Sequence, residues 1–173
     1  LGPWSAALPG APPVPVRPVK GQILRLAGEP LLDGTVRARV RGRAVYLVPY
    51  GDGRLALGAT VEEQGFDGRV TAGAVLDLLA DAVEVVPGLT ELELVETLAR
   101  WRPGTPDNAP LVGPAELPGL VLATGHHRNG VLLTPVTADA VARLLATGAL
   151  PPDAEAFSPA RFAARPAEVP ACR

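Results

Sequence analysis

The turn between residues 125 and 135 carries the residue types best suited to bind a ligand in this chain. It reads Gly-His-His-Arg-Asn-Gly-Val-Leu-Leu-Thr-Pro and runs directly into an apolar segment. We expect Gly125 and Gly130 to take positive φ, which lets the backbone approach a ligand closely. The closing pair, Thr134 and Pro135, predicts a helix N-cap followed by the first helical position. Free backbone N–H groups, a positive helix end and the arginine of the turn together favour an electron-rich or anionic ligand.

Arg102 is the second candidate, because a planar guanidinium can hold a carboxylate by two parallel hydrogen bonds. It follows Trp101 and precedes a run rich in proline. From the residues alone, an arginine that pairs with an acid at a strand end is the favoured interpretation. Tyr46 offers a phenol, although a half-buried aromatic of a sheet fits it nearly as well. Asp107 is expected to stabilise its own turn by accepting hydrogen bonds from local backbone.

Metal and nucleic-acid chemistry find little support in the sequence. His126 and His127 are adjacent, so their side chains point apart, and no cysteine or acid pair supplies further ligands. With 16 basic and 18 acidic residues the net charge is −2, which favours neither nucleic acid nor an anionic membrane as a partner. No apolar run reaches the length of a membrane span. The one cysteine, Cys172, can form no internal disulfide, which suits a reducing cytoplasm.

Composition and hydrophobic patterning predict a folded α+β protein, with a mainly antiparallel sheet and packed helices. The 173 residues are 47% hydrophobic with a mean hydropathy of +0.22, enough for a core. Prolines between residues 3 and 18 predict an extended linker without helix. Thr71 is the expected N-cap of the first helix, and Gly148 the end of the last. The expected strands are 22–26, 35–40, 44–48, 54–59 and 91–102, and the expected helices are 71–86 and 134–146. The last helix is expected to bury Val136, Val141, Leu144 and Leu145.

The two candidate segments resemble the C-terminal half of the glycine oxidases of thiamine biosynthesis, within the D-amino-acid-oxidase-like family of FAD-dependent amine oxidases. In that family an Arg-Pro-Gly-Thr-x-Asp-x-x-Pro segment is followed by a short strand and then by Gly-His-x-Arg-Asn-Gly-x-Leu-Leu-x-Pro. The corresponding residues here are 102–110, 119–124 and 125–135. Matches at 18–22, 45–49 and 57–60 extend the resemblance over about residues 15–148.

The resemblance also indicates what this chain lacks. Flavoenzymes of this kind begin with a βαβ unit whose Gly-x-Gly-x-x-Gly run holds the pyrophosphate of FAD, and no such run occurs here. Residues 1–5 resemble the segment that follows that half in intact relatives, and the chain contains no methionine. We therefore expect a C-terminal fragment that is inactive alone and has the missing FAD-binding half as its partner. The expected parts are a linker at 1–17, a substrate-binding domain at 18–102 and a flavin-capping segment at 103–148, whose helix belongs to the FAD-binding domain. The rest, 149–173, is expected to be a disordered tail apart from a contact by Phe157 and Phe162.

The resemblance implies a role for each candidate residue. Arg102 would grip the substrate carboxylate with help from the Tyr46 phenol. Arg128 would line the pocket near the flavin and meet the same carboxylate, whereas the alternative for it is a surface arginine. No catalytic residue is implied, because the flavin accepts the hydride and the protein mainly positions the substrate. The residues expected to contact the cofactor FAD are Gly125, His127, Arg128, Asn129, Gly130, Val131 and Leu132.

The function that the resemblance implies is the oxidation of glycine or a small amine. The products would be the 2-oxo acid, ammonia and hydrogen peroxide, with oxygen as the second substrate. Because the carboxylate clamp is shared within the family, an oxidase or dehydrogenase of sarcosine, proline or a D-amino acid is the alternative. A catalytically inert structural fragment that binds no FAD is the alternative of another class. We expect a cytoplasmic protein, and a homo-oligomer is compatible with the sequence.

Overall fold

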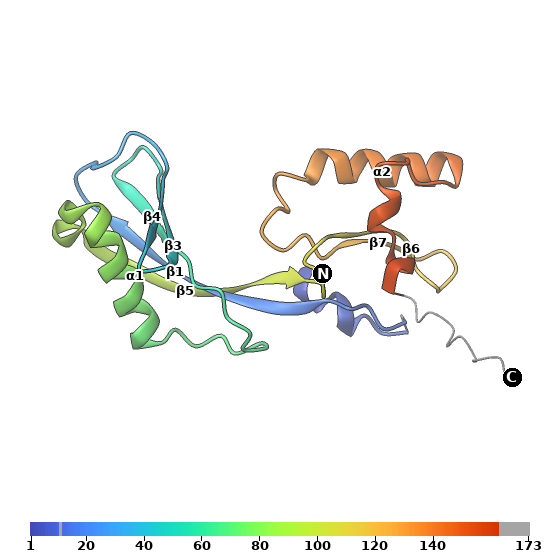
Figure 1. The fold of residues 1–173 in the computed structure, drawn as a ribbon, viewed down its shortest axis with the longest axis horizontal. Coiled ribbons are helices and arrows are strands. Elements are labelled where there is room, and N and C mark those ends of the chain that lie inside the picture. The colour runs from blue at the N-terminus through green and yellow to red at the C-terminus, as the bar shows by residue number, and fades with distance from the viewer. Residues whose placement is uncertain (11, 163–173) are drawn as a thin grey trace, which may run out of the picture. The chain divides into compact units, whose positions relative to one another are not determined.

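The computed structural model describes residues 1–10 and 12–162, which form two compact units. Pro18–Arg102 make up the first, which we call the sheet unit. The second, which we call the hairpin unit, combines Leu1–Arg17 with residues 103–162. Figure 1 shows the elements of each unit along the chain. Among the helices of the described residues, none has the length and apolar character needed to cross a membrane.

The sheet unit is built on five strands in the order β2-β3-β4-β1-β5. The pairs β1–β4, β3–β4 and β2–β3 are all antiparallel, which confirms the predicted sheet. Each strand is found within a few residues of its expected position, because turn residues such as Arg41-Gly42 and Gly51-Asp52-Gly53 separate the apolar runs. The strands are β1 (Arg17–Ala27), β2 (Val36–Val40), β3 (Arg43–Pro49), β4 (Arg54–Gly58) and β5 (Glu93–Gly104).

The two faces of this sheet differ in character, because successive side chains along a strand point to opposite sides. One face carries a row formed by Leu24, Leu57 and Leu47, which are paired across three strands and are fully buried. The helix α1 (Ala72–Val85) packs on this face through Leu78 and Ala82. We call the opposite side the open face. It carries Arg102 and Tyr46, which are described below.

The helix α1 begins where the sequence predicts. The hydroxyl of Thr71 accepts a hydrogen bond from the N–H of Ala74 at 3.3 Å, as an N-cap does. The helix ends before Pro87, which starts the 3-10 helix η2 (Pro87–Glu91). Arg43 holds the helix to β3 through two hydrogen bonds to the Asp81 carboxylate, at 2.6 and 2.7 Å. These bonds lower the pKa of Asp81.

The hairpin unit contains the antiparallel strands β6 (Leu111–Pro114) and β7 (Val121–Thr124), with the helix α2 (Thr134–Thr147) packed beside them. The helix ends at Gly148, whose φ of 77° is the expected left-handed C-cap. Leu144 is buried and Val141 half-buried as predicted, but Val136 and Leu145 are exposed. The buried stripe is narrower than predicted because it is centred on Ala140 and Leu144, one turn apart.

Two further expectations for this unit are wrong. The proline-rich start forms a 3-10 helix, η1 (Gly2–Ala7), because its proline lies in the first turn, where a missing N–H costs nothing. Val14 and Val16 pack on Leu111 and Leu122, so this segment belongs to the core of the unit and is not a separate linker.

The end of the described chain is also ordered where disorder was expected. Residues 149–162 include the 3-10 helices η3 (Glu155–Phe157) and η4 (Pro159–Phe162), and the side chains of Ala154 and Phe157 pack against the hairpin unit. The prediction of disorder was based on the proline- and alanine-rich composition, and the apolar contacts outweigh it here; the expected contact by Phe157 is confirmed. Residues 163–173, which include Cys172, lie outside the described residues.

Candidate functional site

The Arg102 guanidinium lies over a glycine of the sheet. A Cβ atom at position 21 would sit 2.5 Å from both terminal nitrogens of Arg102, so only glycine leaves room for the side chain. Arg102 Nη1 donates a hydrogen bond to the carbonyl oxygen of Thr60 at 3.2 Å. The arginine is half-buried, and the backbone carbonyl of Thr60 is one of its partners.

The Tyr46 phenol lies over a second glycine. A Cβ atom at position 58 would sit 2.6 Å from the phenolic oxygen of Tyr46 and 3.0 Å from a methyl carbon of Ile23. The guanidinium carbon of Arg37, the partner of Tyr46 across β2 and β3, is 5.9 Å from the centre of the ring. The tyrosine is therefore flanked on the sheet by a cation and by an aliphatic side chain.

The strand register places both polar groups on the open face. Ile23 pairs with Gly58, and Gly58 pairs with Tyr46, so the three residues share one face. Gly21 precedes Ile23 by two positions on β1 and therefore faces the same way. The guanidinium over Gly21 and the phenol over Gly58 thus occupy one surface of the sheet.

The turn 125–135 belongs to the hairpin unit, whereas Arg102 and Tyr46 belong to the sheet unit. The turn starts against the end of β5: the N–H of His127 donates to Pro103 O at 2.8 Å, and His126 forms a β-bridge with Gly104. Gly125 is buried with a φ of 76°, and His127 has a φ of 50°. The start of the turn is therefore fixed by backbone geometry.

The later part of the turn is exposed and offers backbone donors. The side chains of Val131 and Leu132 are 93% and 77% exposed, and Arg128 is exposed as well. Asn129 N–H donates to His126 O at 2.9 Å. The N–H groups that find no hydrogen-bond partner among the described residues are those of Arg128, Gly130, Val131 and Leu132. A segment with this composition can meet a flat ligand that has hydrogen-bond acceptors on its edge.

Two details of the turn differ from the prediction. Gly130 does not take a positive φ; instead His127 does, because the reversal occurs early, where the chain leaves β7. The N-cap of α2 is Leu133 and not Thr134. The hydroxyl of Thr134 donates to Gly130 O at 2.7 Å, so this threonine stabilises the turn from the first helical position.

His126 is held by Thr137, whose hydroxyl oxygen is 3.0 Å from its Nε2. Burial lowers the pKa of this imidazole from 6.5. A histidine that stays neutral in the folded protein binds fewer protons than in the unfolded chain, so its contribution to stability is complete above pH 6.5 and is lost as the pH falls through the folded pKa.

We therefore expect His126→Gln to reduce the loss of stability between about pH 7 and pH 5. Urea unfolding of both proteins at the two pH values measures this difference. Carboxylates titrate mainly below this range, and their contribution to the loss of stability is the same in both proteins, so it cancels in the comparison. An equal loss in the two proteins would contradict the assignment.

Asp107 stabilises its own turn, as predicted. Its Oδ1 accepts hydrogen bonds from the Ala109 N–H at 3.0 Å and from the Thr105 hydroxyl at 2.9 Å. Hydrogen bonds from Arg161 hold the pKa of its carboxyl well below the usual range. This residue therefore ties η4 to the turn and has a structural role.

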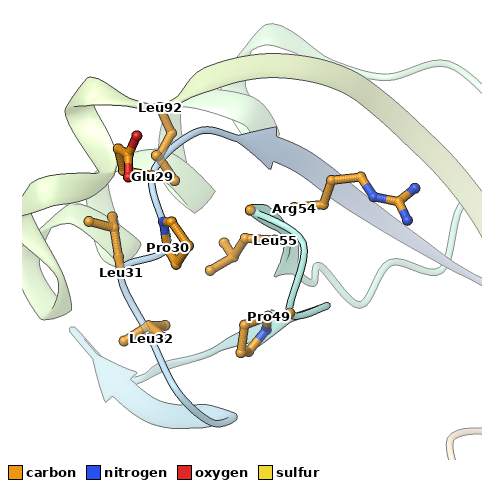
Figure 2. A pocket seen from close by; sticks show the side chains of 10 residues that line it. Glu29, Pro30, Leu31, Leu32, Pro49, Arg54, Leu55 and Leu92 are labelled. Atoms are coloured by element: carbon orange, nitrogen blue, oxygen red, sulfur yellow. The ribbon is translucent and has the colours of Figure 1, made fainter.

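In the part of the chain that the structure describes, no metal centre coincides with the candidate residues. Among the described residues, no three histidine, cysteine, aspartate or glutamate side chains are grouped to hold a metal ion. A pocket with a volume of about 20 Å³ is lined by Leu32, Leu55 and Leu92, among others. Figure 2 shows these side chains around it. That volume suits about one water molecule. No candidate residue lines this pocket.

A buried polar cluster next to the clamp was not predicted. Lys20 and Gln22 are 1% and 0% exposed, and both contact Glu62. The signal was present in the alternation of β1, where Lys20 and Gln22 continue the face that Leu24 and Leu26 bury. Polar side chains on a buried face require hydrogen-bond partners. Their presence at Lys20 and Gln22 therefore indicates a specific role for these two residues.

Comparisons with known proteins agree for both units. Residues 1–144 match the family described as DAO, FAD dependent oxidoreductase. The chain is 39% identical over 134 residues to the bifunctional protein ThiO/ThiG of Nostoc sp., covering 77% of this chain and 21% of that protein. It is 42% identical over 149 residues to the glycine oxidase of Geobacillus kaustophilus, covering 83% of this chain and 38% of that protein.

The fold comparison gives the same result. The crystal structure of glycine oxidase from Geobacillus kaustophilus superposes with a TM-score of 0.78 at 37% identity, over 91% of this chain and 43% of that one. The chain therefore spans less than half the length of each of these relatives.

Proposed function

Because the chain belongs to the family of FAD dependent oxidoreductases, we propose that its sheet unit binds the carboxylate of glycine or another small amine for oxidation by FAD. The observation that carries this proposal is the pair of Arg102 and Tyr46 on one face of the sheet, each over a glycine that leaves room for it. A similar protein at 42% identity is named glycine oxidase.

Arg102 supplies the charge of the proposed clamp. Its planar fork matches the two oxygens of a carboxylate, and the carbonyl of Thr60 limits its movement. The phenol of Tyr46 donates a further hydrogen bond to the carboxylate. Fixing the carboxylate at two points orients the α-carbon, which is the main task of the protein in such an oxidation. Arg128, in the hairpin unit, is proposed as a further substrate-binding residue.

The exposed donors of the turn fit one edge of FAD. The N–H groups of Arg128, Gly130, Val131 and Leu132 can donate to carbonyl and nitrogen acceptors of a flavin ring, and the apolar side chains beside them suit its flat surface. Gly125 and His127 hold the start of the turn, and Asn129 lies within it. Bound FAD supplies the two-electron acceptor of the reaction. The proposed reaction yields the 2-oxo acid, ammonia and hydrogen peroxide from the amino acid, water and oxygen.

The proposal includes a further FAD-binding part, because the chain has no Gly-x-Gly-x-x-Gly run. That part would be contributed by the complete gene product or by another chain, in the cytoplasm. The test is a peroxide assay with glycine on the complete gene product, beside residues 1–173 alone. We expect flavin absorbance and peroxide from the first, and neither from the second. A flavin-containing gene product that is not reduced by glycine or by other small amines under anaerobic conditions would refute the proposal.

Gly130→Val tests the flavin contact of the turn. A Cβ atom at this position meets no atom closer than 3.7 Å, and the φ is not positive, so the fold should tolerate the change within about 0.5 kcal/mol. A side chain there would nevertheless intrude on a ligand that lies against the turn. In the complete gene product, we therefore expect Gly130→Val to weaken FAD binding, measured by fluorescence quenching. The melting temperature of the apoprotein should remain almost unchanged. Unchanged FAD affinity would make the turn an ordinary surface loop.

A further inference from the structure

The carbonyl group that holds Arg102 belongs to a tightly bonded residue. Thr60 follows β4, and its backbone N–H donates to Gln22 O at 3.2 Å. Its hydroxyl accepts a hydrogen bond from the Gln22 N–H at 2.8 Å and donates to the Glu62 carboxylate. Thr60 is thus attached to β1 through its backbone and its side chain, and its own carbonyl remains directed to Arg102.

The partners of Thr60 are themselves fixed. Gln22 Nε2 donates to Glu62 Oε1 at 2.8 Å, and Gln22 Oε1 accepts from the Thr71 N–H at 2.9 Å. The ammonium of Lys20 is 3.7 Å from Glu62 Oε2, and the backbones of Lys20 and Glu62 exchange two hydrogen bonds of 2.9 Å. The four residues Lys20, Gln22, Thr60 and Glu62 form a connected group, which we call the Thr60 network.

This group lies behind the open face. Gln22 and Lys20 alternate with Gly21, so their side chains point to the face opposite the one that carries the Arg102 guanidinium. Apolar residues at these positions would be sufficient to pack against α1, as Leu24 and Leu26 do further along β1. Buried polar groups whose hydrogen bonds are all made hold a structure in one arrangement. Apolar packing restricts the arrangement less strictly.

We propose that the Thr60 network positions Arg102 for the substrate carboxylate, with Thr60 as the positioning residue that contacts it. This inference rests on the proposed function of Arg102. An arginine side chain has many rotamers, and ordering it at the moment of binding weakens affinity. A carbonyl that is already fixed orders the guanidinium in advance. The network therefore acts on carboxylate affinity, and it leaves the chemical step unchanged.

Thr60→Val and Thr60→Ser form the matched pair that tests this. Valine keeps the shape but removes the hydroxyl, whereas serine keeps the hydroxyl. In 1–173, we expect Thr60→Val to lower the heteronuclear NOE of the Arg102 Nε–Hε signal, assigned with Arg102→Lys, and Thr60→Ser to leave it near the original value. In the complete gene product, we expect Thr60→Val to raise the KM for glycine about tenfold, with kcat changed less than about twofold.

Thr90→Val is the control for a merely structural effect. It removes a hydroxyl that bonds Pro87 O within the same unit, away from the clamp. We expect it to change neither the NOE nor the KM. If Thr60→Val fails to fold, Thr60→Cys replaces it, because a thiol is a weak donor and acceptor and should shift both quantities in the same direction by less.

The outcomes separate the two proposals. An unchanged Arg102 NOE in folded Thr60→Val or Thr60→Cys would overturn the positioning role, whatever the kinetics. A lowered NOE together with glycine kinetics that do not respond to Arg102→Ala would support the positioning of Arg102 and refute the proposed clamp.

Discussion

Replacing Arg102 with alanine in the complete gene product is expected to raise the KM for glycine by about thirtyfold or more. Removal of one partner from a desolvated charge pair costs about 2–5 kcal/mol, and 1.4 kcal/mol corresponds to a factor of ten. The Thr60 carbonyl would lose its donor in the same step. Initial-rate kinetics with peroxide detection measure the effect.

Two variants sharpen this result. Arg102→Lys should restore part of the affinity, because lysine carries the charge without the planar fork. Arg100→Ala is the matched control on β5: Arg100 is exposed and its Nη1 bonds the carbonyl of its neighbour Ala99 at 2.8 Å. We expect Arg100→Ala to leave the KM unchanged. If both alanine substitutions raised the KM equally, the effect would come from positive charge in general, and Arg102 would not be a specific carboxylate clamp.

The fold could be predicted where local patterns determine it. Alternating apolar residues place β1, β3 and β4, and Thr71 marks the start of α1 because its hydroxyl can accept a hydrogen bond from an N–H of the first turn. The proline-rich segments at both ends were less predictable. Their packing depends on partners distant in sequence, such as Leu111 beside Val14 and Asp107 beside Arg161.

The site was predictable in residue type more than in geometry. The guanidinium and the phenol could be identified as candidates, but the glycines below them have a function only once the register pairs Ile23 with Gly58. Gly130 was expected to take a positive φ because glycine adopts it without strain, whereas the positive φ values lie at Gly125 and His127. A glycine in a sequence does not reveal whether φ, space or neither requires it.

Gly125→Ala is expected to destabilise the hairpin unit by about 2–5 kcal/mol, because two separate costs add at this position. The φ of Gly125 is 76°, which an alanine adopts with strain, and its Cβ would lie 2.5 Å from Cγ2 of Thr105. Thr105 is fully buried, and its hydroxyl bonds Ala109 O at 2.7 Å, so the methyl group cannot move aside.

Other glycines of the same unit separate these costs. Gly148 has a φ of 77° with no atom within 4 Å of a Cβ, so Gly148→Ala should show the backbone strain alone, about 1–2 kcal/mol. Gly130→Ala should show neither cost. Thr105→Ser removes the clashing methyl group and keeps the hydroxyl, so in the Gly125→Ala background it should recover part of the loss. Urea unfolding of the four variants measures each term. If Gly125→Ala proved no more destabilising than Gly148→Ala, the close packing of Gly125 on Thr105 would be disproved, and with it the rigid start of the turn on which the proposed flavin contact depends.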